Sequence, residues 1–206
     1  MTTTTLVKTA GTVLLTAQTV QSNAVVVGTA VDVSAKLGAQ VFVNAGRVPG
    51  SLASGNAPVF QIQGLADTGS EWAPIYTWTT ANHIYAPTAQ TLNSNAAAGA
   101  VSVQLSAALG SNLSNPMLIY NSANPALSEF NQAQVTSTAT ALNNSLTGAQ
   151  TAGVAIGVSH AEQWSFPIDV TALTRVRLVV NNIWNAVAQP YLVSAKINTT
   201  DNATTA

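Results

Sequence analysis

The sequence predicts an all-β protein: a β-sandwich of jelly-roll-like type with a small β-rich lobe inserted into it. Three observations carry this prediction. Short segments rich in β-branched residues recur along the chain, Gly, Asn, Pro or Ser bounds each of them, and no long segment has a helical period. With 206 residues the chain is long enough for one substantial β domain carrying an insertion, so a packed core is expected.

Seven segments are the expected strands. Apolar and polar residues alternate most clearly in 59–63 and 101–105, as in strands with one buried and one wet face. The Ala-rich segments 95–100 and 134–142 have some helical propensity, but Thr and Ser in the second weaken it, and at most one short helix is expected. The seven segments are 12–15, 24–27, 39–43, 59–63, 101–105, 117–120 and 176–180.

Two parts of the chain correspond to each other. Asp32-Val33-Ser34-Ala35 precedes a strand ending in Val-Asn, and Asp169-Val170-Thr171-Ala172 precedes another at the same offset. An Asp followed two residues later by Ser or Thr can bond nearby backbone and form a turn. The interpretation is two strands used similarly in one sandwich. Chance similarity of two short turns is the alternative.

Composition divides the chain into an outer sandwich and a lobe. The segment 93–159 contains one charged residue, Glu129, and many Asn and Ser loops. It is predicted to be the inserted β-rich lobe, and residues 1–92 with 160–200 the outer sandwich. The polar, low-complexity residues 201–206 are predicted to be a flexible tail.

Charge is scarce. Only 6% of the residues are charged, against roughly 25% in an ordinary soluble domain, and the net charge is −1. A surface built from Thr, Ser, Asn, Gln and Ala suits burial against neighbours, because little charge must be desolvated. A β protein that merely lacks charge is the alternative.

The same composition argues against several partners and sites. Nucleic acid is not an expected partner, because the six basic residues form no run. The absence of cysteine removes disulfides and thiolate chemistry. No apolar stretch is long enough for a membrane span, and the first residues lack a signal-peptide pattern. We expect a protein that is used in the cytoplasm or in a particle assembled there, with no membrane partner.

Little in the sequence points to catalysis. His83 and His160 are far apart, and no nucleophile elbow, phosphate-binding Gly loop or metal-spaced cluster is present. His160 with Glu162, or Asp67 with Glu71, could contribute to a metal site, but neither pair has a third ligand. The prediction is a protein that is not an enzyme and has no cofactor or metal.

Six residues are the candidate interface. Trp72, Tyr76 and Trp78 share parity on one predicted strand, so they are expected to project together as core or as a subunit interface. Together with Tyr85 they could instead form a glycan-binding platform. Arg175 and Arg177 share a face at the start of another strand and could pair with acidic groups. Arg47 completes the set.

Eight segments of the chain form a set of turn and strand patterns: 32–43, Gly46-Arg47, 71–75, 99–103, 118–120, 128–130, 169–171 and 175–181. Together they resemble an uncharacterised group of structural proteins of tailed bacteriophages. The likeness has no signature residue. It implies a virion protein assembled in the host cytoplasm, a β-sandwich that decorates or cements the major capsid shell, and it brings no catalytic residues.

The predicted function is therefore capsid decoration on the virion surface. The expected partners are the major capsid protein and copies of the chain itself, as a dimer or trimer. A protein that binds the closed shell and not its dissociated subunits stabilises the shell by mass action. The alternatives are a tail, baseplate or head-fibre component, a glycan-binding module, and a hydrolase whose site the sequence does not reveal.

Overall fold

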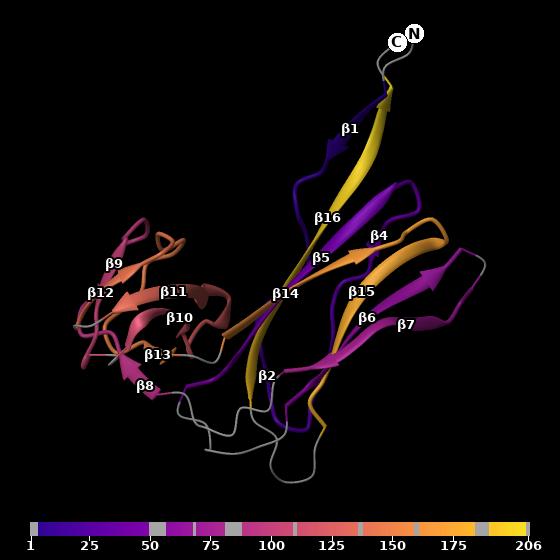
Figure 1. The fold of residues 1–206 in the computed structure, drawn as a ribbon. Coiled ribbons are helices and arrows are strands. Elements are labelled where there is room, and N and C mark those ends of the chain that lie inside the picture. The colour runs from indigo at the N-terminus through magenta and orange to yellow at the C-terminus, as the bar shows by residue number, and fades with distance from the viewer. Residues whose placement is uncertain are drawn as a thin grey trace.

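A computed structural model describes residues 4–49, 57–67, 69–80, 88–108, 111–135, 138–158, 161–183 and 190–204. Within these residues the chain forms strands and one 3-10 turn, η1 (Pro125–Leu127), and every strand pair is antiparallel. None of the described residues belongs to a helix long and apolar enough to cross a membrane. The prediction of an all-β, sandwich-like fold is confirmed (Figure 1).

Two five-stranded sheets form the sandwich. Sheet A has the order β1-β16-β5-β14, and β2 also pairs with β16; sheet B has the order β3-β15-β6-β7, and β4 also pairs with β15. Sheet A contains β1 (Thr4–Lys8), β2 (Thr12–Val20), β5 (Gly38–Arg47), β14 (Ala161–Ile168) and β16 (Tyr191–Thr204). Sheet B contains β3 (Val25–Val27), β4 (Val31–Asp32), β6 (Val59–Ala66), β7 (Trp72–Thr79) and β15 (Leu173–Asn181).

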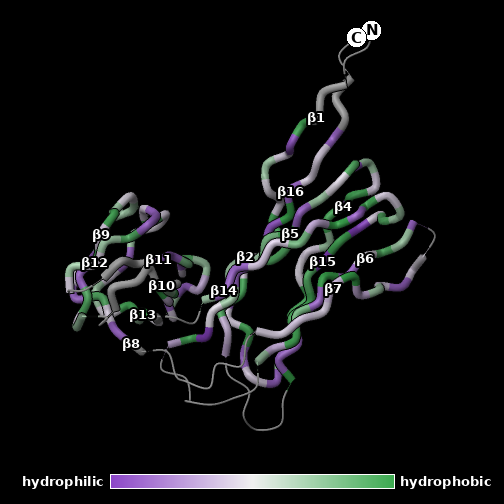
Figure 2. The backbone as a smooth tube through the Cα atoms, viewed as in Figure 1, coloured by the Kyte–Doolittle hydropathy of each residue, from purple (hydrophilic) through white to green (hydrophobic). Residues whose placement is uncertain are grey.

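The core of the sandwich lies between these sheets. Alternate residues of β5 and β6, such as Val41, Val43, Phe60 and Ile62, are fully buried, whereas their neighbours in the strands are more exposed. Figure 2 shows the resulting change of hydropathy along the strands of both sheets. Each fully buried aliphatic or aromatic side chain contributes about 1.5–3 kcal/mol. Burial of these two inner faces therefore stabilises the sandwich.

The two similar turns of the sequence have the same hydrogen bonds. The backbone N–H and the hydroxyl of Ser34 donate to Asp32 Oδ1 at 2.9 and 2.7 Å, and those of Thr171 donate to Asp169 Oδ1 at 3.0 and 2.7 Å. These bonds favour the ionised carboxyl, so the pKa of each lies below its ordinary value, mainly through the Ser34 hydroxyl for Asp32 and the Thr171 N–H for Asp169. The two turns therefore correspond in each of these hydrogen bonds, as the sequence predicts.

The strands that follow these turns have equivalent neighbours. In sheet A, β5 lies between β16 and β14; in sheet B, β15 lies between β6 and β4. The strand that follows each turn is thus central in its own sheet. The strands that come immediately before and after this central strand in the chain both belong to the other sheet. The sandwich therefore has an approximate internal twofold arrangement, which makes a chance similarity of the turns a poor explanation.

The lobe is a six-stranded sheet with its own core, in the order β8-β13-β10-β11-β12-β9. Buried residues such as Leu92, Met117, Ile119 and Ile156 form this second core. Strand β8 begins at Thr88, whereas the sequence analysis predicted that the lobe begins at residue 93. The strands are β8 (Thr88–Thr91), β9 (Ser102–Gln104), β10 (Ser111–Tyr120), β11 (Glu129–Val135), β12 (Ala139–Leu142) and β13 (Ala155–Val158).

The lobe packs on one end of the outer face of sheet A. Gly46 of β5 has no side chain there, and a Cβ at this position would lie 3.0 Å from a ring carbon of Phe130 and 3.2 Å from Leu118. The hydroxyls of Thr19 and Tyr120 are 3.0 Å apart across the same junction. Glycine at position 46 therefore permits the close approach of the lobe.

The first and last described strands extend beyond sheet A as a two-stranded ribbon. β16 pairs with β5 only as far as Thr200, and from Thr200 to Thr204 it pairs with β1. Figure 1 shows this ribbon rising from the sandwich, with the start of β1 beside the end of β16. Residues 201–204, predicted as a flexible tail, instead form strand, because their backbone groups are paired with those of β1.

Candidate interaction surface

Tyr76 and Trp78 belong to an aromatic cluster between the two sheets. The ring of Trp78 stacks on that of Phe60 at 5.4 Å between centroids and meets that of Phe166 at 4.5 Å. The ring of Tyr76 lies 4.9 Å from that of Phe166, and the Tyr76 hydroxyl donates to the carbonyl of Pro167 at 3.0 Å. Because β7 and β14 are the edge strands of different sheets, this cluster holds these two edges together.

Trp72 does not project with Tyr76 and Trp78, so the prediction that all three side chains lie on one face of the strand is wrong. Ile62 pairs with Tyr76, but Gln63 pairs with Pro74, so the ladder contains a bulge at Ile75. One extra residue moves every later side chain to the other face. Trp72 therefore lies on the outer face of sheet B, while Tyr76 and Trp78 face the core.

Both arginines of β15 lie on this outer face as well. The Arg177 guanidinium is 4.0 Å from the centre of a Trp72 ring, and its Nε donates to Gln63 Oε1 at 2.9 Å. Arg175 is paired in register with Asp32 of β4, and its charge adds to the lowering of the Asp32 pKa. Trp72, Arg175 and Arg177 thus form one group on the exterior, and Arg177 covers one ring face of Trp72.

Arg47 is separate from the other candidates and is 1% exposed. It is opposite Tyr191 in the ladder of β5 and β16, and the Tyr191 hydroxyl is 3.5 Å from that of Thr80. Burial lowers the pKa of the Arg47 guanidinium and raises the pKa of the Tyr191 hydroxyl. The side chain of Arg47 is enclosed in this chain and is not on its surface.

The possible catalytic or metal-binding residues do not converge in the described part of the chain. No group of three or more His, Asp or Glu side chains is placed to hold a metal there. Asp67 and Glu71 are exposed in the turn between β6 and β7. His83 and His160 lie outside the described residues, as does Tyr85.

The outer face of sheet A carries a row of residues that the sequence analysis missed. Ser165, Phe42, Lys196 and Val13 are adjacent across four strands, in the order β14-β5-β16-β2. Phe42 is 36% exposed and Val13 is 42% exposed. Four strands far apart in sequence meet here, so only the alternation within β5 could have indicated that Phe42 faces outward.

Amides and small polar side chains surround this row. The Gln40 amide donates to Ser165 Oγ at 2.6 Å, and Asn44 is paired in register with Gln163 and Ser194. A crevice of about 300 Å³ borders the face where the lobe begins, lined by Phe130, Asn131, Gln132, Ala161 and Gln163. A groove of about 410 Å³ borders it at the base of the ribbon, lined by Lys8, Gly38, Ala39, Gln40, Pro167, Ile168 and 198–200.

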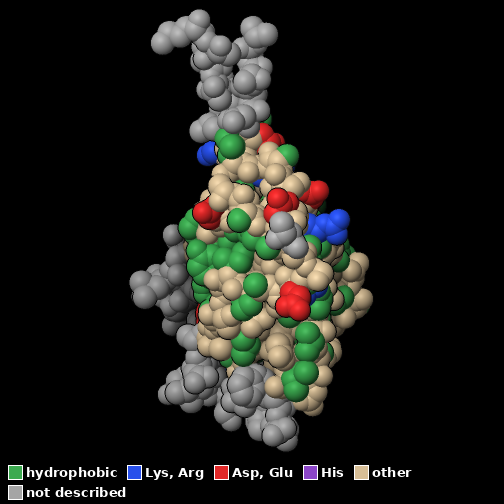
Figure 3. Space-filling model, turned by 90° about the vertical axis from the view of Figure 1, so that its right-hand side faces the viewer, with side chains coloured by type: hydrophobic (Ala, Val, Ile, Leu, Met, Phe, Trp, Pro, Cys, Tyr) green, Lys and Arg blue, Asp and Glu red, His purple; other side chains and the backbone are tan. Residues whose placement is uncertain are grey.

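Charge is concentrated at the ribbon end of the sandwich. Figure 3 shows the charged side chains of one face gathered toward that end. In the lobe the single carboxylate, Glu129, accepts hydrogen bonds from the N–H groups of Thr147 and Gly148 at 2.9 Å each. Nine of the thirteen charged residues lie at the ribbon end: Lys8, Asp32, Lys36, Asp67, Glu71, Asp169, Arg175, Arg177 and Asp201.

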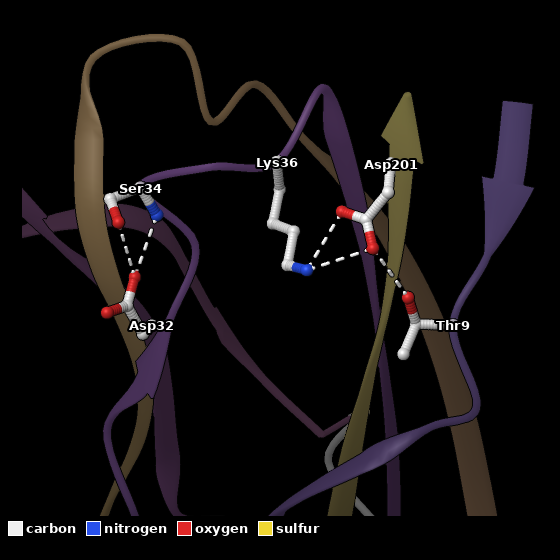
Figure 4. A network of polar contacts seen from close by, with 5 residues as sticks. All are labelled: Thr9, Asp32, Ser34, Lys36 and Asp201. Atoms are coloured by element: carbon white, nitrogen blue, oxygen red, sulfur yellow. Dashed lines mark hydrogen bonds and ion pairs between the residues drawn. The ribbon is translucent and has the colours of Figure 1, made fainter. Parts of the chain in front are cut away.

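An ion pair anchors the base of the ribbon (Figure 4). Lys36 Nζ lies 2.8 Å from Asp201 Oδ1 and 2.9 Å from Oδ2, and the Thr9 hydroxyl donates to Oδ2 at 3.0 Å. The hydrogen bond from Lys36, followed by that from Thr9, holds the pKa of Asp201 below its ordinary value of 3.8. Asp201 therefore connects β16 to β1 and to the turn before β5.

Acid is expected to loosen this anchor. A carboxyl with a lowered pKa in the folded state contributes stability that is complete above its ordinary pKa and is lost as the pH falls through the lowered value. Cross-strand NMR contacts between Lys8 and Thr200 should be constant above about pH 4 and weaken below it. The variant Asp201→Asn should show weaker contacts without that acid step. Contacts that persist unchanged to pH 2 in the unmodified chain would contradict the anchor.

No protein-family model matches the chain, and no curated protein matches it. Among solved structures, the PBSX exported protein XepA is 9% identical, covering 93% of this chain and 86% of that chain with a TM-score of 0.25. PNGase F, a glycosylasparaginase from Flavobacterium meningosepticum, is 9% identical, covering 99% of this chain and 100% of that chain with a TM-score of 0.24. Likenesses this weak carry no argument about function.

Proposed function

We propose that the chain is a structural protein of a tailed bacteriophage particle, where it decorates or cements the capsid. The observation that carries the proposal is the distribution of charge. Nine of thirteen charged residues lie at one end of the sandwich, and the lobe has only Glu129, whose carboxylate is bound to backbone. Such broad uncharged surfaces cost little to desolvate and suit burial in an assembly.

The ribbon of β1 and β16 supports an assembled state. A two-stranded ribbon is marginally stable in water, and its outer edges present unpaired backbone groups. Beyond Thr200, no described strand other than β1 pairs with β16, and β1 pairs with no other described strand. A neighbouring subunit or the capsid shell would supply the missing contacts, and many weak contacts repeated over a lattice give firm attachment.

The proposed action requires no chemical step. Attachment to the closed shell stabilises it by mass action, by about 2.7 kcal/mol per site when the free concentration is 100 times Kd. The partners are the major capsid protein and further copies of the chain, and the location is the capsid surface. A tail, baseplate or head-fibre role has the same architecture and differs in copy number.

The copy number in purified particles tests this proposal. Quantitative mass spectrometry of intact virions of the phage that encodes the chain should give a ratio to the major capsid protein near one, or a simple fraction of one. A handful of copies per particle would instead assign the protein to the tail or to a single vertex. Absence from the particles would refute the virion role.

A further inference from the structure

We propose that the outer face of sheet A, between the lobe and the ribbon, is a docking surface for a protein partner that carries carboxylates around an apolar patch. This inference rests on the proposed function, under which that partner is the capsid shell. The face is centred on the row Ser165, Phe42, Lys196 and Val13, and it is here called the docking face.

Hydrophobic side chains lie on the docking face where a wet sheet face would be polar. The segment Val41-Phe42-Val43 is apolar without interruption, which is typical of strands covered on both faces. Val41 and Val43 are covered by the core, whereas Phe42 is exposed. Phe42 and Val13 lie two strands apart in the same row, with Lys196 between them, so a partner that covered the row would cover both apolar side chains.

An existing interface covers one end of the same surface. Gly46, Leu192 and Ala161 form the adjoining part of the outer face, and Leu192 and Ala161 are buried where the lobe lies over β5. The exposed row continues the same strands away from the lobe. The lobe therefore covers one part of the outer face of sheet A, and the docking face is the exposed part that adjoins it.

The positive charges beside the docking face indicate what kind of partner would bind there. Lys8 and Lys196 lie on this side of the sheet, since Lys8 is opposite Thr200 and Lys196 is opposite Phe42. None of the described residues whose side chains lie on the outer faces of β5, β14 and β16 is acidic, although the chain as a whole has a net charge of −1. Carboxylates on the partner would complement these two cations, and exposed pairs of this kind act on association rate and specificity.

The relief of the docking face suits an irregular protein surface. The groove at the ribbon base has Lys8 at its edge, and the crevice beside the lobe is lined on the side of sheet A by the exposed Gln163. An amide side chain both donates and accepts hydrogen bonds, so that of Gln163 can bond either backbone or side-chain groups. Two hollows at opposite ends of one face would fix the orientation of the partner.

Reversal of both lysines tests the proposal. Purified variants are mixed with shells of the encoding phage prepared without this gene, and binding is measured by co-sedimentation at 50 and 300 mM salt. Lys8→Glu with Lys196→Glu should weaken binding at least tenfold at low salt and remove most of its salt dependence. The control Arg175→Glu changes an exposed charge on sheet B and should leave binding within about twofold.

A second variant tests the apolar centre without changing charge. Phe42→Ser should also weaken binding about tenfold, while thermal unfolding and circular dichroism stay close to those of the unmodified chain. Wild-type affinity in both tests would overturn the docking face but leave the proposed function intact. If the unmodified chain failed to bind the shells, the proposed function itself would fail. Variants that turned an oligomer into a monomer and still bound shells would show a contact between copies and overturn the proposal.

Discussion

Trp78→Ala is expected to lower the free energy of unfolding by about 3 kcal/mol, the range found when large aromatic side chains are removed from packed cores. Trp78 contacts Phe60 of its own sheet and Phe166 of the opposite sheet. Without it, the edge strands β7 and β14 lose the ring between them. Urea unfolding measures the change, and an unaltered slope with denaturant would show that the loss is in stability alone.

Trp72→Ala is the matched control. The two tryptophans belong to one strand, but Trp72 lies on the outer face of sheet B, with the Arg177 guanidinium 4.0 Å from the centre of its ring. Loss of such a cation–π contact costs about 0.5–1 kcal/mol. Equal losses at both positions would contradict the bulge at Ile75. Normal stability of Trp78→Ala, combined with lost retention on a sugar matrix, would favour the glycan-binding alternative.

The strands and turns could be predicted from the sequence because they depend on local patterns. All seven expected strands overlap strands of the structure, and the Asp-Val-Ser/Thr turns recur with the expected hydrogen bonds. The Ala-rich segments are not helical where the structure describes them; β12 occupies part of the second. Its Thr residues and its pairing with β9 and β11 outweigh the propensity of Ala.

The candidate site was less predictable because it depends on pairing between distant segments. Alternation along 72–78 predicts that Trp72, Tyr76 and Trp78 lie on one face, but one bulged residue, Ile75, places Trp72 on the opposite face. The neighbouring Pro74 was the one local signal that the strand is irregular. Arg47 follows a glycine and resembles a surface turn, yet Tyr191 of β16 is its neighbour in the ladder. The row on the docking face is formed by four strands, so no single segment contains it.

Gly28→Ala is expected to destabilise the sandwich by about 2 kcal/mol, a typical cost of forcing extra volume into a packed site. A Cβ at Gly28 would lie 2.4 Å from the carbonyl oxygen of Leu14 and 3.2 Å from that of Leu178. Both are backbone atoms, and they belong to different sheets. The N–H of Gly28 donates to Leu178 at 2.8 Å, and that of Thr29 donates to Leu14 at 2.7 Å, so the segment bridges sheet A and sheet B.

Gly38→Ala is the control for this substitution, because the space around Gly38 is open. No atom lies within 4 Å of a Cβ built there, and the residue is in strand β5 opposite Thr200. Its free energy of unfolding should stay within about 0.5 kcal/mol or rise slightly, since Ala has fewer unfolded conformations than Gly. Calorimetry of both variants measures the difference. If Gly28→Ala were as stable as Gly38→Ala, that result would contradict the close approach of the two sheets at Gly28.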